Sequence, residues 1–382
     1  MKIPQQTNPY SANKVFWHTD KIDKLRNGEL FPPTNIQIDL EAFCPHDCSF
    51  CAYRNAGFNA TGMKFFNPDW APDVSTIHTG QPKGKINKYS HIPKEIALKL
   101  LDEMKEEGIK AIEITGGGES LAYPYIKEFL QKCIDNEIEV ALVTNGQLLT
   151  SPIMELLLKC NLKWIRFSID ARYEDTYMNI HKTKKGIFEK LIKTIKLLKD
   201  YKEQLNKDFL IGISFVITKD NYQEIVKASI FWKVIGIDNI RFTFTYDINY
   251  DSGLSPNEMT VTKDEIEDAL RQETENFKVF VMKERPDYYS TPNDDFSFCG
   301  YQFFTWAIGY DGKVYPCCIQ KYYDGYEIGD LNNESLKEII YGEKRKQYIE
   351  KFNVKACKPC WLRDKNIRIE QAISKPMHEN FI

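Results

Sequence analysis

The sequence lacks two features that would assign a protein to a membrane or to nucleic acid: long hydrophobic runs and an excess of basic residues. No apolar segment approaches the ~20 residues of a membrane-spanning helix, and the first residues, MKIPQQTNPYSANK, contain no hydrophobic core typical of a signal peptide. Lys and Arg total 51 against 54 for Asp and Glu, so the formal net charge is −3, without the basic surplus of a nucleic-acid-binding protein. We therefore expect a cytosolic protein with neither a membrane nor a nucleic acid as its partner.

Internal repeats and low-complexity tracts are also missing, and the composition is that of an ordinary globular protein, with 42% hydrophobic and 27% charged residues. A chain of 382 residues is long enough for one large α/β domain and a smaller second one.

Ten cysteines stand out against this background, because a cytosolic protein keeps its thiols reduced and seldom forms disulfides. Two of them, Cys133 and Cys160, lie in helical patterns beside apolar residues, and we expect them to be buried core residues. The other eight form one group near the start and another near the end of the chain: Cys44, Cys48 and Cys51, and Cys299, Cys317, Cys318, Cys357 and Cys360. Such grouping in a reducing compartment indicates metal or redox chemistry.

Short β-rich runs alternate with amphipathic helical patterns over residues 35–245. The expected strands are 35–40, 111–115, 139–144, 164–170, 209–217 and 239–244, and the clearest helical patterns are 92–108, 123–136 and 186–205. This alternation predicts βαβ units and a parallel sheet, arranged as a partial (β/α)6 TIM-like barrel or, alternatively, as an open doubly wound sheet. The lysine-rich helix at 182–207 has an apolar stripe of Ile187, Leu191, Ile195 and Leu198, which predicts a surface helix.

Two segments interrupt this pattern. Residues 52–91 form a long connection rich in Gly, Asn, Pro and aromatic residues, which favours a lid or a binding loop over a disordered insertion. Residues 246–262 read as a turn-rich linker that ends the barrel. Beyond it we expect a hairpin over 303–318 with a tight turn at Asp311-Gly312, and a short helix over 333–342. The expected domains are an N-terminal segment (1–34), the barrel (35–245), a linker and helix (246–298) and a small cysteine-rich domain (299–382).

Polar and cysteine motifs follow four consecutive expected strands. Three cysteines in C-x3-C-x2-C spacing follow the first strand, TGGGES (115–120) the second and TNG (144–146) the third, while Ser168 and Asp170 end the fourth. Because the carboxyl ends of parallel strands meet at one edge, where α/β folds build their active sites, these motifs should converge.

The glycine run Gly116, Gly117 and Gly118 permits positive φ angles and lets backbone approach a ligand closely. It is not a phosphate loop, since no G-K-[ST] follows and the next residue, Glu119, would repel phosphate. An acid beside open backbone suits a ligand with an ammonium group, whereas the alternative is a simple tight turn with a Glu at a helix start.

Together these motifs resemble the radical S-adenosylmethionine (radical SAM) enzymes. The resemblance implies that Cys44, Cys48 and Cys51 hold three irons of a [4Fe–4S] cluster, while the amino and carboxylate groups of S-adenosylmethionine chelate the fourth. It further implies a cofactor-binding set in which Phe50 packs near the adenine, Glu119 engages the amino group, and Ser168 and, less firmly, Asp170 reach the ribose. The full expected set is Phe50, Gly116, Gly117, Gly118, Glu119, Asn145, Ser168 and Asp170. One departure is Ser120, where many relatives have proline.

An iron left without a protein ligand agrees with the general rule that catalytic metal sites keep an open position. In the resembling family the reduced cluster cleaves S-adenosylmethionine to a 5′-deoxyadenosyl radical, which abstracts a hydrogen atom from the substrate. The competing interpretation, a zinc site made by these three cysteines with His46, is sterically crowded and departs from the usual zinc spacings.

The second cysteine group offers four ligands from three places, Cys299, Cys317, Cys357 and Cys360, which is enough to close a zinc or an iron–sulfur site. Gly312 and Cys317 match the G-x4-C element of the SPASM or shorter twitch extension of radical SAM enzymes. A full SPASM domain needs seven cysteines, so the resemblance here implies one auxiliary [4Fe–4S] cluster. Cys318 is left with three interpretations: a core residue, an alternative ligand or a hydrogen-atom donor to a substrate radical.

The resemblance leaves the substrate open between a ribosomal peptide or protein side chain, which we favour slightly, and a small molecule such as a sugar, aminocyclitol or nucleotide. Only 34 residues precede the first strand, too few for a fused peptide-recognition domain, so a peptide substrate implies a separate leader-binding protein or a groove on the barrel. An electron donor such as flavodoxin or ferredoxin is the other expected partner. A non-catalytic iron–sulfur or zinc protein is the weaker alternative.

Overall fold

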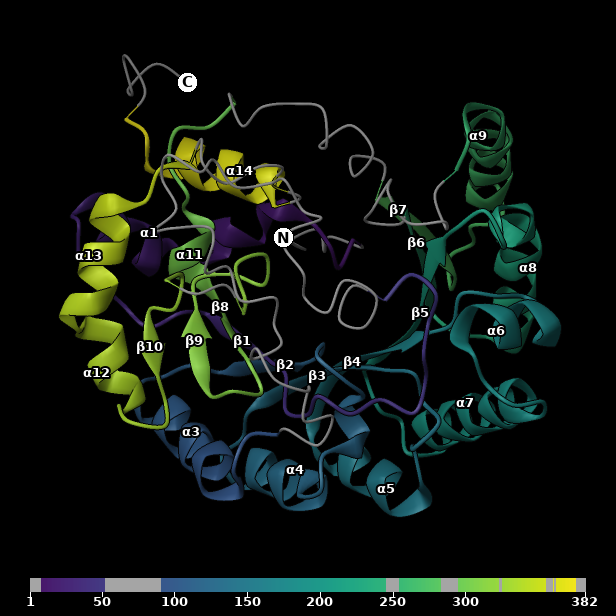
Figure 1. Cartoon of the computed structure of the whole chain (residues 1–382), viewed down its shortest axis with the longest axis horizontal. Coiled ribbons are helices and arrows are strands. Elements are labelled where there is room, and N and C mark those ends of the chain that lie inside the picture. Colours follow the sequence, from purple (N-terminus) through teal and green to yellow (C-terminus); the bar gives the residue numbers. More distant parts are fainter. Residues whose placement is uncertain are drawn as a thin grey trace, which may run out of the picture.

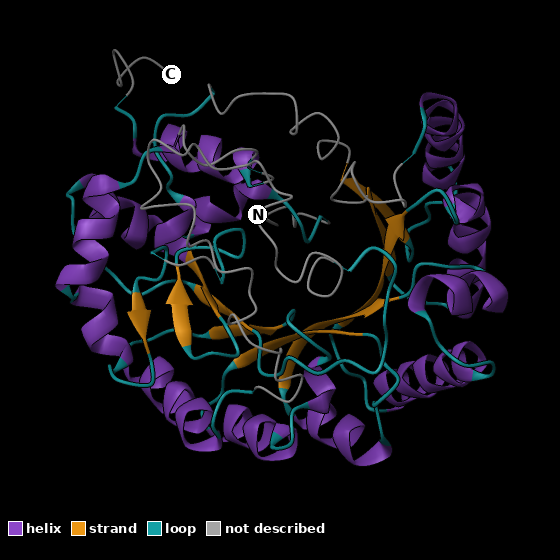
Figure 2. Cartoon of the chain, in the orientation of Figure 1, coloured by secondary structure: helices purple, strands orange, loops and turns teal. Residues whose placement is uncertain are grey.

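The computed structural model describes residues 8–51, 91–244, 254–282, 295–322, 325–354, 360 and 362–375, so the expected loop at 52–91 lies almost wholly outside the described residues. Figure 1 shows a strongly curved sheet whose concave side faces the N-terminal segment and the last helix, α14 (Arg363–Ile373). Figure 2 shows the strands as an inner wall and most helices as an outer layer around it. No helix in the described part of the chain is both long and apolar enough to cross a membrane.

The first six strands confirm the expected βα alternation. They are β1 (Asn35–Ile38), β2 (Ala111–Ile114), β3 (Glu139–Thr144), β4 (Asn161–Ser168), β5 (Leu210–Ile217) and β6 (Asn239–Phe244). The helices that accompany them are α3 (Lys94–Glu106), α4 (Ile126–Asp135), α5 (Ser151–Lys159), α6 (Glu174–His181), α7 (Ile187–Gln204) and α8 (Ile225–Ile235). The strands pair in chain order and all in parallel, and their helices lie on the outer face (Figure 1). A doubly wound sheet would reverse its strand order and carry helices on both faces, so the fold is the partial barrel.

The sheet continues past both ends of the six expected strands. β7 (Lys278–Met282) adds in parallel to β6, and β8 (Thr305–Ile308) adds in parallel to β1. β9 (Lys313–Tyr315) and β10 (Gly329–Asp330) then follow antiparallel, giving a sheet of ten strands. The cysteine-rich part of the chain therefore extends the barrel sheet itself.

Three expected elements have different bounds. Residues 246–253 of the linker expected at 246–262 lie outside the described residues. The rest of this prediction is wrong, because helix α9 (Pro256–Leu270) begins there, capped reciprocally by Ser255 and Glu258. The hairpin is confirmed, with Ala307 opposite Tyr315, but residues 301–304 belong to a short helix, α11 (Tyr301–Phe304), because the chain turns before it joins β1. The helix expected at 333–342 is α12 (Leu336–Tyr341), which is followed by α13 (Glu343–Lys351).

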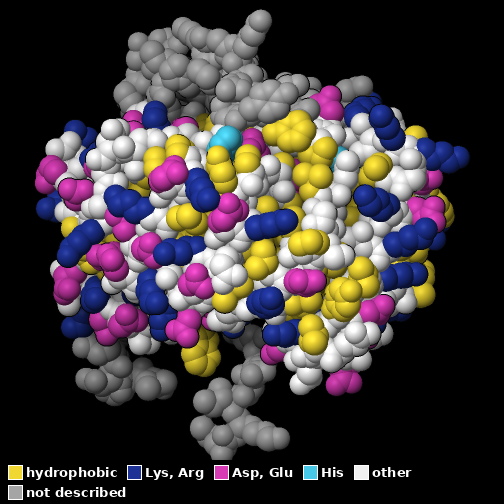
Figure 3. All heavy atoms as spheres, turned by 90° about the horizontal axis from the view of Figure 1, so that it is seen from below, with side chains coloured by type: hydrophobic (Ala, Val, Ile, Leu, Met, Phe, Trp, Pro, Cys, Tyr) yellow, Lys and Arg dark blue, Asp and Glu magenta, His cyan; other side chains and the backbone are white. Residues whose placement is uncertain are grey.

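The main core lies between the strands and the outer helices. Cys133 and Cys160 are buried in it, as the sequence indicates. The buried stripe of α7 is Phe188, Leu191, Ile195 and Leu198, so Phe188 takes the place expected for Ile187, which is only partly buried. Figure 3, seen from below Figure 1, shows Lys and Arg side chains intermixed with Asp and Glu over much of the outer helices.

The N-terminal segment packs on the C-terminal extension. It forms a 3-10 helix, η1 (Ala12–Trp17), and helix α1 (Thr19–Arg26), whose apolar residues join a second core with the residues around α11 and α14. The Phe31 ring is tilted against that of Phe303 and lies edge-on to that of Phe304. The Thr34 amide donates to the Phe304 carbonyl at 2.7 Å. These contacts join the entry to β1 to the extension.

Candidate functional site

A cavity of about 1060 Å³ lies on the concave side of the sheet. The three cysteines of the loop and every residue of the expected cofactor-binding set line it: Cys44, Cys48 and Cys51, and Phe50, Gly116, Gly117, Gly118, Glu119, Asn145, Ser168 and Asp170. Cys318 and Lys321 of the extension line the same cavity, so both parts of the chain build its wall. The convergence predicted from four separate strand ends is therefore observed.

The cysteine loop is held against the end of α6. The Asp47 amide donates to the His181 carbonyl at 3.1 Å, and the Ser49 amide donates to the Ile180 carbonyl at 2.9 Å. Within the loop, the Cys51 amide donates to the Cys48 carbonyl at 3.1 Å. These backbone bonds fix the spacing of the loop without using the cysteine sulfurs.

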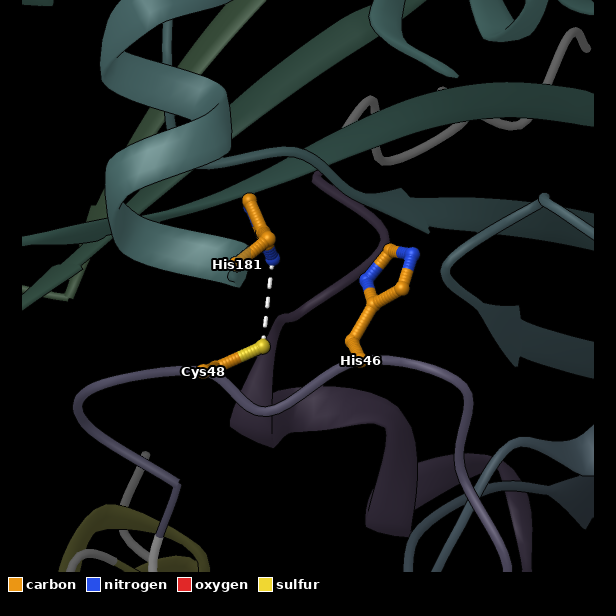
Figure 4. Close-up of side chains that lie close together, drawn as sticks. All are labelled: His46, Cys48 and His181. Carbon is orange, nitrogen blue, oxygen red and sulfur yellow. Dashed lines mark hydrogen bonds between the residues drawn. The ribbon is translucent and has the colours of Figure 1, made fainter. Parts of the chain in front are cut away.

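His181 contacts one cysteine of the loop directly. Its Nδ1 lies 3.1 Å from the Cys48 sulfur, as Figure 4 shows, and its Nε2 lies 3.2 Å from Asp170 Oδ2. His46 lies beside the pair, with its Nε2 2.8 Å from Gln147 Oε1. His46, Cys48 and His181 offer three donor atoms within metal-binding reach of one another. The zinc interpretation paired His46 with three cysteines, whereas the structure brings it next to one cysteine and a second histidine.

Burial dominates the electrostatics at this end of the cavity. It raises the pKa of the Cys48 thiol well above its usual value, and the neighbouring Cys51, Asp170 and Cys44 raise it further. Burial also raises the pKa of Asp170 to about 8 and lowers that of His181 well below its usual value. Thiolates crowded at such a site need positive charge to stabilise them, and an iron–sulfur cluster supplies it. The donor set therefore fits the expected cluster.

The glycine run packs on the segment that leads into the cysteine loop. The Gly118 amide donates to the Glu41 carbonyl and the Glu119 amide to the Phe43 carbonyl, both at 2.7 Å. A Cβ on Gly118 would lie 2.2 Å from the Phe43 carbonyl oxygen, so only glycine allows this approach. The sequence predicted that the glycine backbone would approach a ligand closely. At Gly118 it approaches protein backbone instead.

Glu119 is almost fully buried and joins the ends of β2 and β3. Its carboxylate accepts hydrogen bonds from the Asn145 amide at 2.8 Å, the Leu121 amide at 3.1 Å and the Thr144 hydroxyl. Burial raises its pKa, and these hydrogen bonds oppose the shift. Asn145, held in this way, directs its side-chain Nδ2 to the Cys44 sulfur at 3.6 Å. Glu119 therefore positions a donor to the cysteine loop, and its contact with an ammonium group stays a prediction.

Asp170 and Ser168 differ in their surroundings. Asp170 is fully buried, accepts from the Val216 amide and faces His181, an arrangement that supports the cysteine loop. Ser168 is only partly buried and lines the cavity. Of the two residues expected near the ribose, Ser168 is the more accessible.

A buried ion pair links β1 to the extension. Lys321 Nζ lies 2.5 Å from Asp39 Oδ2, and the Tyr322 hydroxyl donates to the same oxygen at 2.8 Å. Burial raises the pKa of Asp39, while Lys321 acts in the opposite direction. This pair anchors the segment just after Cys318 at the level of the cysteine loop. Sequence reasoning missed both His181 and Lys321, since neither belongs to a local motif.

The second cysteine group is separate from the first. Cys299, Cys317 and Cys360 line one small cavity with Tyr348 and Asn366, whereas Cys357 lies outside the described residues. The Asn366 Nδ2 donates to the Cys360 sulfur at 3.8 Å. Burial raises the pKa of Cys299 to about 11, so here too thiolates need a cationic partner. Cys318 lies in a different environment, because it lines the large cavity and not the small one.

Comparisons with known proteins match both parts of the chain. The family model of the radical SAM superfamily matches residues 38–228, and the SPASM iron–sulfur cluster-binding domain matches residues 299–361. An AdoMet-dependent heme synthase of Methanosarcina barkeri is 32% identical over 37% of this chain, a match that spans 38% of that protein. The PqqA peptide cyclase of Granulibacter bethesdensis is 20% identical over 81% of this chain and 74% of its own length. The crystal structure of Streptococcus suis SuiB bound to precursor peptide SuiA has the same fold, with a TM-score of 0.61 and 17% identity over 92% of this chain and 75% of that one.

Proposed function

Since the chain belongs to the radical SAM superfamily and carries a SPASM iron–sulfur cluster-binding domain, we propose that this enzyme modifies a side chain of a ribosomally made peptide or of a protein. The family match sets aside the alternative of a non-catalytic iron–sulfur or zinc protein. The observation that supports the proposal most is the shared cavity, in which the cysteine loop of the barrel faces Cys318 and Lys321 of the extension.

The cofactors of this enzyme are a [4Fe–4S] cluster, S-adenosylmethionine and an auxiliary iron–sulfur cluster. We assign the first cluster to Cys44, Cys48 and Cys51, and the auxiliary cluster to Cys299, Cys317, Cys357 and Cys360. When bound, the first cluster and S-adenosylmethionine supply a 5′-deoxyadenosyl radical that takes a hydrogen atom from the substrate.

The residues of this chain orient that chemistry. Gly118 and Glu119 fasten the cysteine loop through their amides, and Asn145 donates toward Cys44. Phe50 lies at the cavity wall with its ring 6.4 Å from that of His181, a position suited to packing against an adenine. Ser168 is the accessible hydroxyl for the ribose. The buried wall excludes water from the reacting atoms.

Two observations support a peptide as substrate. The cavity, at about 1060 Å³, is at the top of the range of roughly 300–1,000 Å³ typical of pockets for one small ligand, so it has room for a side chain beside the cofactor. The relatives that span most of this chain include a protein named as a peptide cyclase, and the SuiB structure contains a precursor peptide. We also propose a cytosolic location, a flavodoxin or ferredoxin as electron donor and a separate leader-recognition protein as partners.

The experiment that tests the proposal uses anaerobically reconstituted, reduced enzyme with S-adenosylmethionine and each short peptide encoded beside its gene. We expect formation of 5′-deoxyadenosine and methionine, together with a mass change in one peptide. Replacing Cys44, Cys48 and Cys51 together by Ala should abolish both, whereas Cys357→Ala should leave some cleavage of S-adenosylmethionine without product. Turnover of a sugar, aminocyclitol or nucleotide, with every peptide unchanged, would contradict the peptide assignment.

A further inference from the structure

An acid and a base face each other across β3 without a hydrogen bond between them. Glu113 on β2 and Arg166 on β4 both line the large cavity, and Arg166 Nη2 lies 3.9 Å from Glu113 Oε1. A hydrogen bond from nitrogen to oxygen is about 2.7–3.2 Å long. The strand between them carries Ala141, which pairs with Glu113 and has only a methyl group as its side chain. The two charged groups therefore leave a gap on the cavity wall.

Neighbouring side chains hold each group in place. Glu113 Oε2 accepts a hydrogen bond from Gln37 Nε2 at 2.8 Å, and Gln37 pairs with Glu113 in the register of β1 and β2. The Cζ atom of Arg166 lies 4.5 Å from the centre of the Trp164 ring and 5.5 Å from that of Tyr10. A guanidinium group packed on rings keeps its N–H edge available to a planar partner. The acid and the base are thus fixed with the gap between them.

Arg166 is buried, and its capacity to donate hydrogen bonds is not fully used. Its side chain is 7% exposed, and its Nε has no hydrogen-bond partner among the described residues. The Glu113 side chain is 19% exposed, so this carboxylate is accessible from the cavity. A buried cation whose N–H groups lack acceptors costs free energy, and a ligand that bridges the gap removes part of that cost. The pair therefore has the features of a binding site.

The pair lies next to the expected cofactor site. Glu113 precedes Thr115 by two residues at the end of β2, and Arg166 precedes Ser168 by two residues on β4. Residues two apart on a strand face the same side, about 6.6 Å apart. Thr115, which leads into the glycine run, and Ser168 also line the cavity. The pair is therefore one strand step below this level of the wall, in which β1 to β4 lie side by side (Figure 1).

The facing atoms select a group that has one donor and one acceptor side by side. A carboxylate would meet Glu113 as a like charge, and an ammonium group would meet Arg166 in the same way. A primary carboxamide offers an N–H to Glu113 Oε1 and a carbonyl oxygen to the guanidinium group. The main-chain peptide group is trans, so its N–H and C=O point to opposite sides and do not bridge the pair. The geometry favours an Asn or Gln side chain over peptide backbone.

We propose that Glu113 and Arg166 bind the carboxamide of an Asn or Gln side chain of the peptide, beside the residue that reacts. This inference deepens the proposed function and rests on it, because a peptide presents such a side chain within one strand step of the cofactor. The adenine edge of S-adenosylmethionine presents a similar donor and acceptor pair, and the experiment separates the two sources.

The test uses the full-length, anaerobically reconstituted enzyme saturated with S-adenosylmethionine, so that the adenine is already in place. Calorimetry measures the binding of three probes: N-acetyl-L-glutamine methylamide, the charged N-acetyl-L-glutamate methylamide and the apolar N-acetyl-L-leucine methylamide. The glutamine probe should bind about tenfold tighter or more than either of the others, in line with hydrogen bonds to charged groups. Arg166→Met should abolish this preference without changing the affinity for S-adenosylmethionine.

A matched control removes the cation of another ion pair on the same strand. Lys163 lies 3.2 Å from Glu139 and lines the same cavity, and Lys163→Met should keep the glutamine preference.

A second variant tests the proposal even if Arg166→Met fails to fold. Glu113→Gln keeps the shape of the side chain and an oxygen toward Gln37, but it presents an NH2 group to the gap. The site then offers donors only, so the preference should reverse and the glutamate probe should bind more tightly than the glutamine probe.

Three results would overturn the proposal. The first is equal affinity of the unmodified enzyme for the glutamine and leucine probes. The second is tighter binding of the glutamate probe to that enzyme, which would mean that the other cations of the cavity, Lys14 and Lys365, outweigh Glu113. The third is weaker binding of S-adenosylmethionine to both Arg166→Met and Glu113→Gln, which would assign the pair to the adenine. Failure of the proposed function looks different: no peptide is modified, while the glutamine preference persists.

Discussion

His181 and Cys48, which are 133 residues apart in the sequence, meet with 3.1 Å between the histidine Nδ1 and the cysteine sulfur. A cysteine that ligates iron is a thiolate and accepts hydrogen bonds only, so Nδ1 must carry the hydrogen in this contact. The other ring nitrogen, Nε2, accepts a hydrogen bond from the Asp170 backbone amide at 3.3 Å. Hydrogen bonds from neighbouring residues to a metal-ligating side chain fix its orientation and adjust the redox potential of the metal.

Removing this donor should lower the reduction potential of the first cluster. His181→Phe keeps a ring of similar size but loses the N–H that donates to the sulfur. That hydrogen bond stabilises the reduced, more negative cluster. We expect a shift on the order of tens of millivolts to more negative potential, measured by a redox titration followed by electron paramagnetic resonance. Tyr177→Phe is the control. The Tyr177 ring packs on the same imidazole, with 4.3 Å between the ring centres, but its hydroxyl has no hydrogen-bond partner among the described residues and so donates none to the sulfur. An unchanged potential in His181→Phe would refute this role.

Gly118→Ala should destabilise the protein and impair loading of the cluster. The new methyl group would lie 2.2 Å from the Phe43 carbonyl oxygen, so the segment before the cysteine loop has to move. Overpacking against backbone costs about 1–3 kcal/mol. Urea unfolding gives the stability and iron analysis the cluster content. Gly28→Ala is the control: its φ of +71° strains an alanine and lowers stability, but the new methyl group meets nothing within 4 Å, so the variant should keep its iron. Equal loss of iron in both variants would contradict the packing argument.

Cys318→Ala should retain the iron of both clusters. Cys318 lines the large cavity, whereas its neighbour Cys317 lines the small one with Cys299 and Cys360. Cys317→Ala should therefore lose auxiliary iron, and Cys318→Ala should not. If Cys318 donates a hydrogen atom to a substrate radical, its variant should still cleave S-adenosylmethionine but lose product. Iron loss in Cys318→Ala equal to that in Cys317→Ala would make it a ligand instead.

The stability of the N-terminal docking should rise with pH above 8. Burial lowers the pKa of Lys21 to about 8, from an unfolded value near 10.5, although its ammonium donates to the Pro32 carbonyl at 2.9 Å. Between these pH values the unfolded chain binds more protons than the folded one, so the free energy of unfolding rises with pH in that window. Urea unfolding at pH 7.5 and 9.5 measures this. Lys21→Met should lack the added rise, and an equal slope in both proteins would rule the effect out.

Local patterns in the sequence predicted much of the fold because strand and helix periodicity records which face of each element is buried. The cysteine spacing and the glycine run could be recognised because each motif lies within a few consecutive residues. The start of α9 was missed although its signal, Ser255 followed by Glu258, is local. The additional strand β7 was missed, and the hairpin arm that forms β8 was not predicted to pair with β1, because a short strand gains its neighbours in a sheet from tertiary structure.

The sequence by itself determined the class of chemistry: three cysteines in one loop, a glycine-glutamate turn and alternating strands and helices suffice for it. Only the tertiary structure decided that His181 supports Cys48, that Lys321 reaches Asp39 and that Arg166 and Arg241 face the same space as Lys365. These side chains come from elements far apart in the chain, and their contacts depend on the curvature and register of the sheet. Charge and burial at such points arise from packing, so no spacing in the sequence records them.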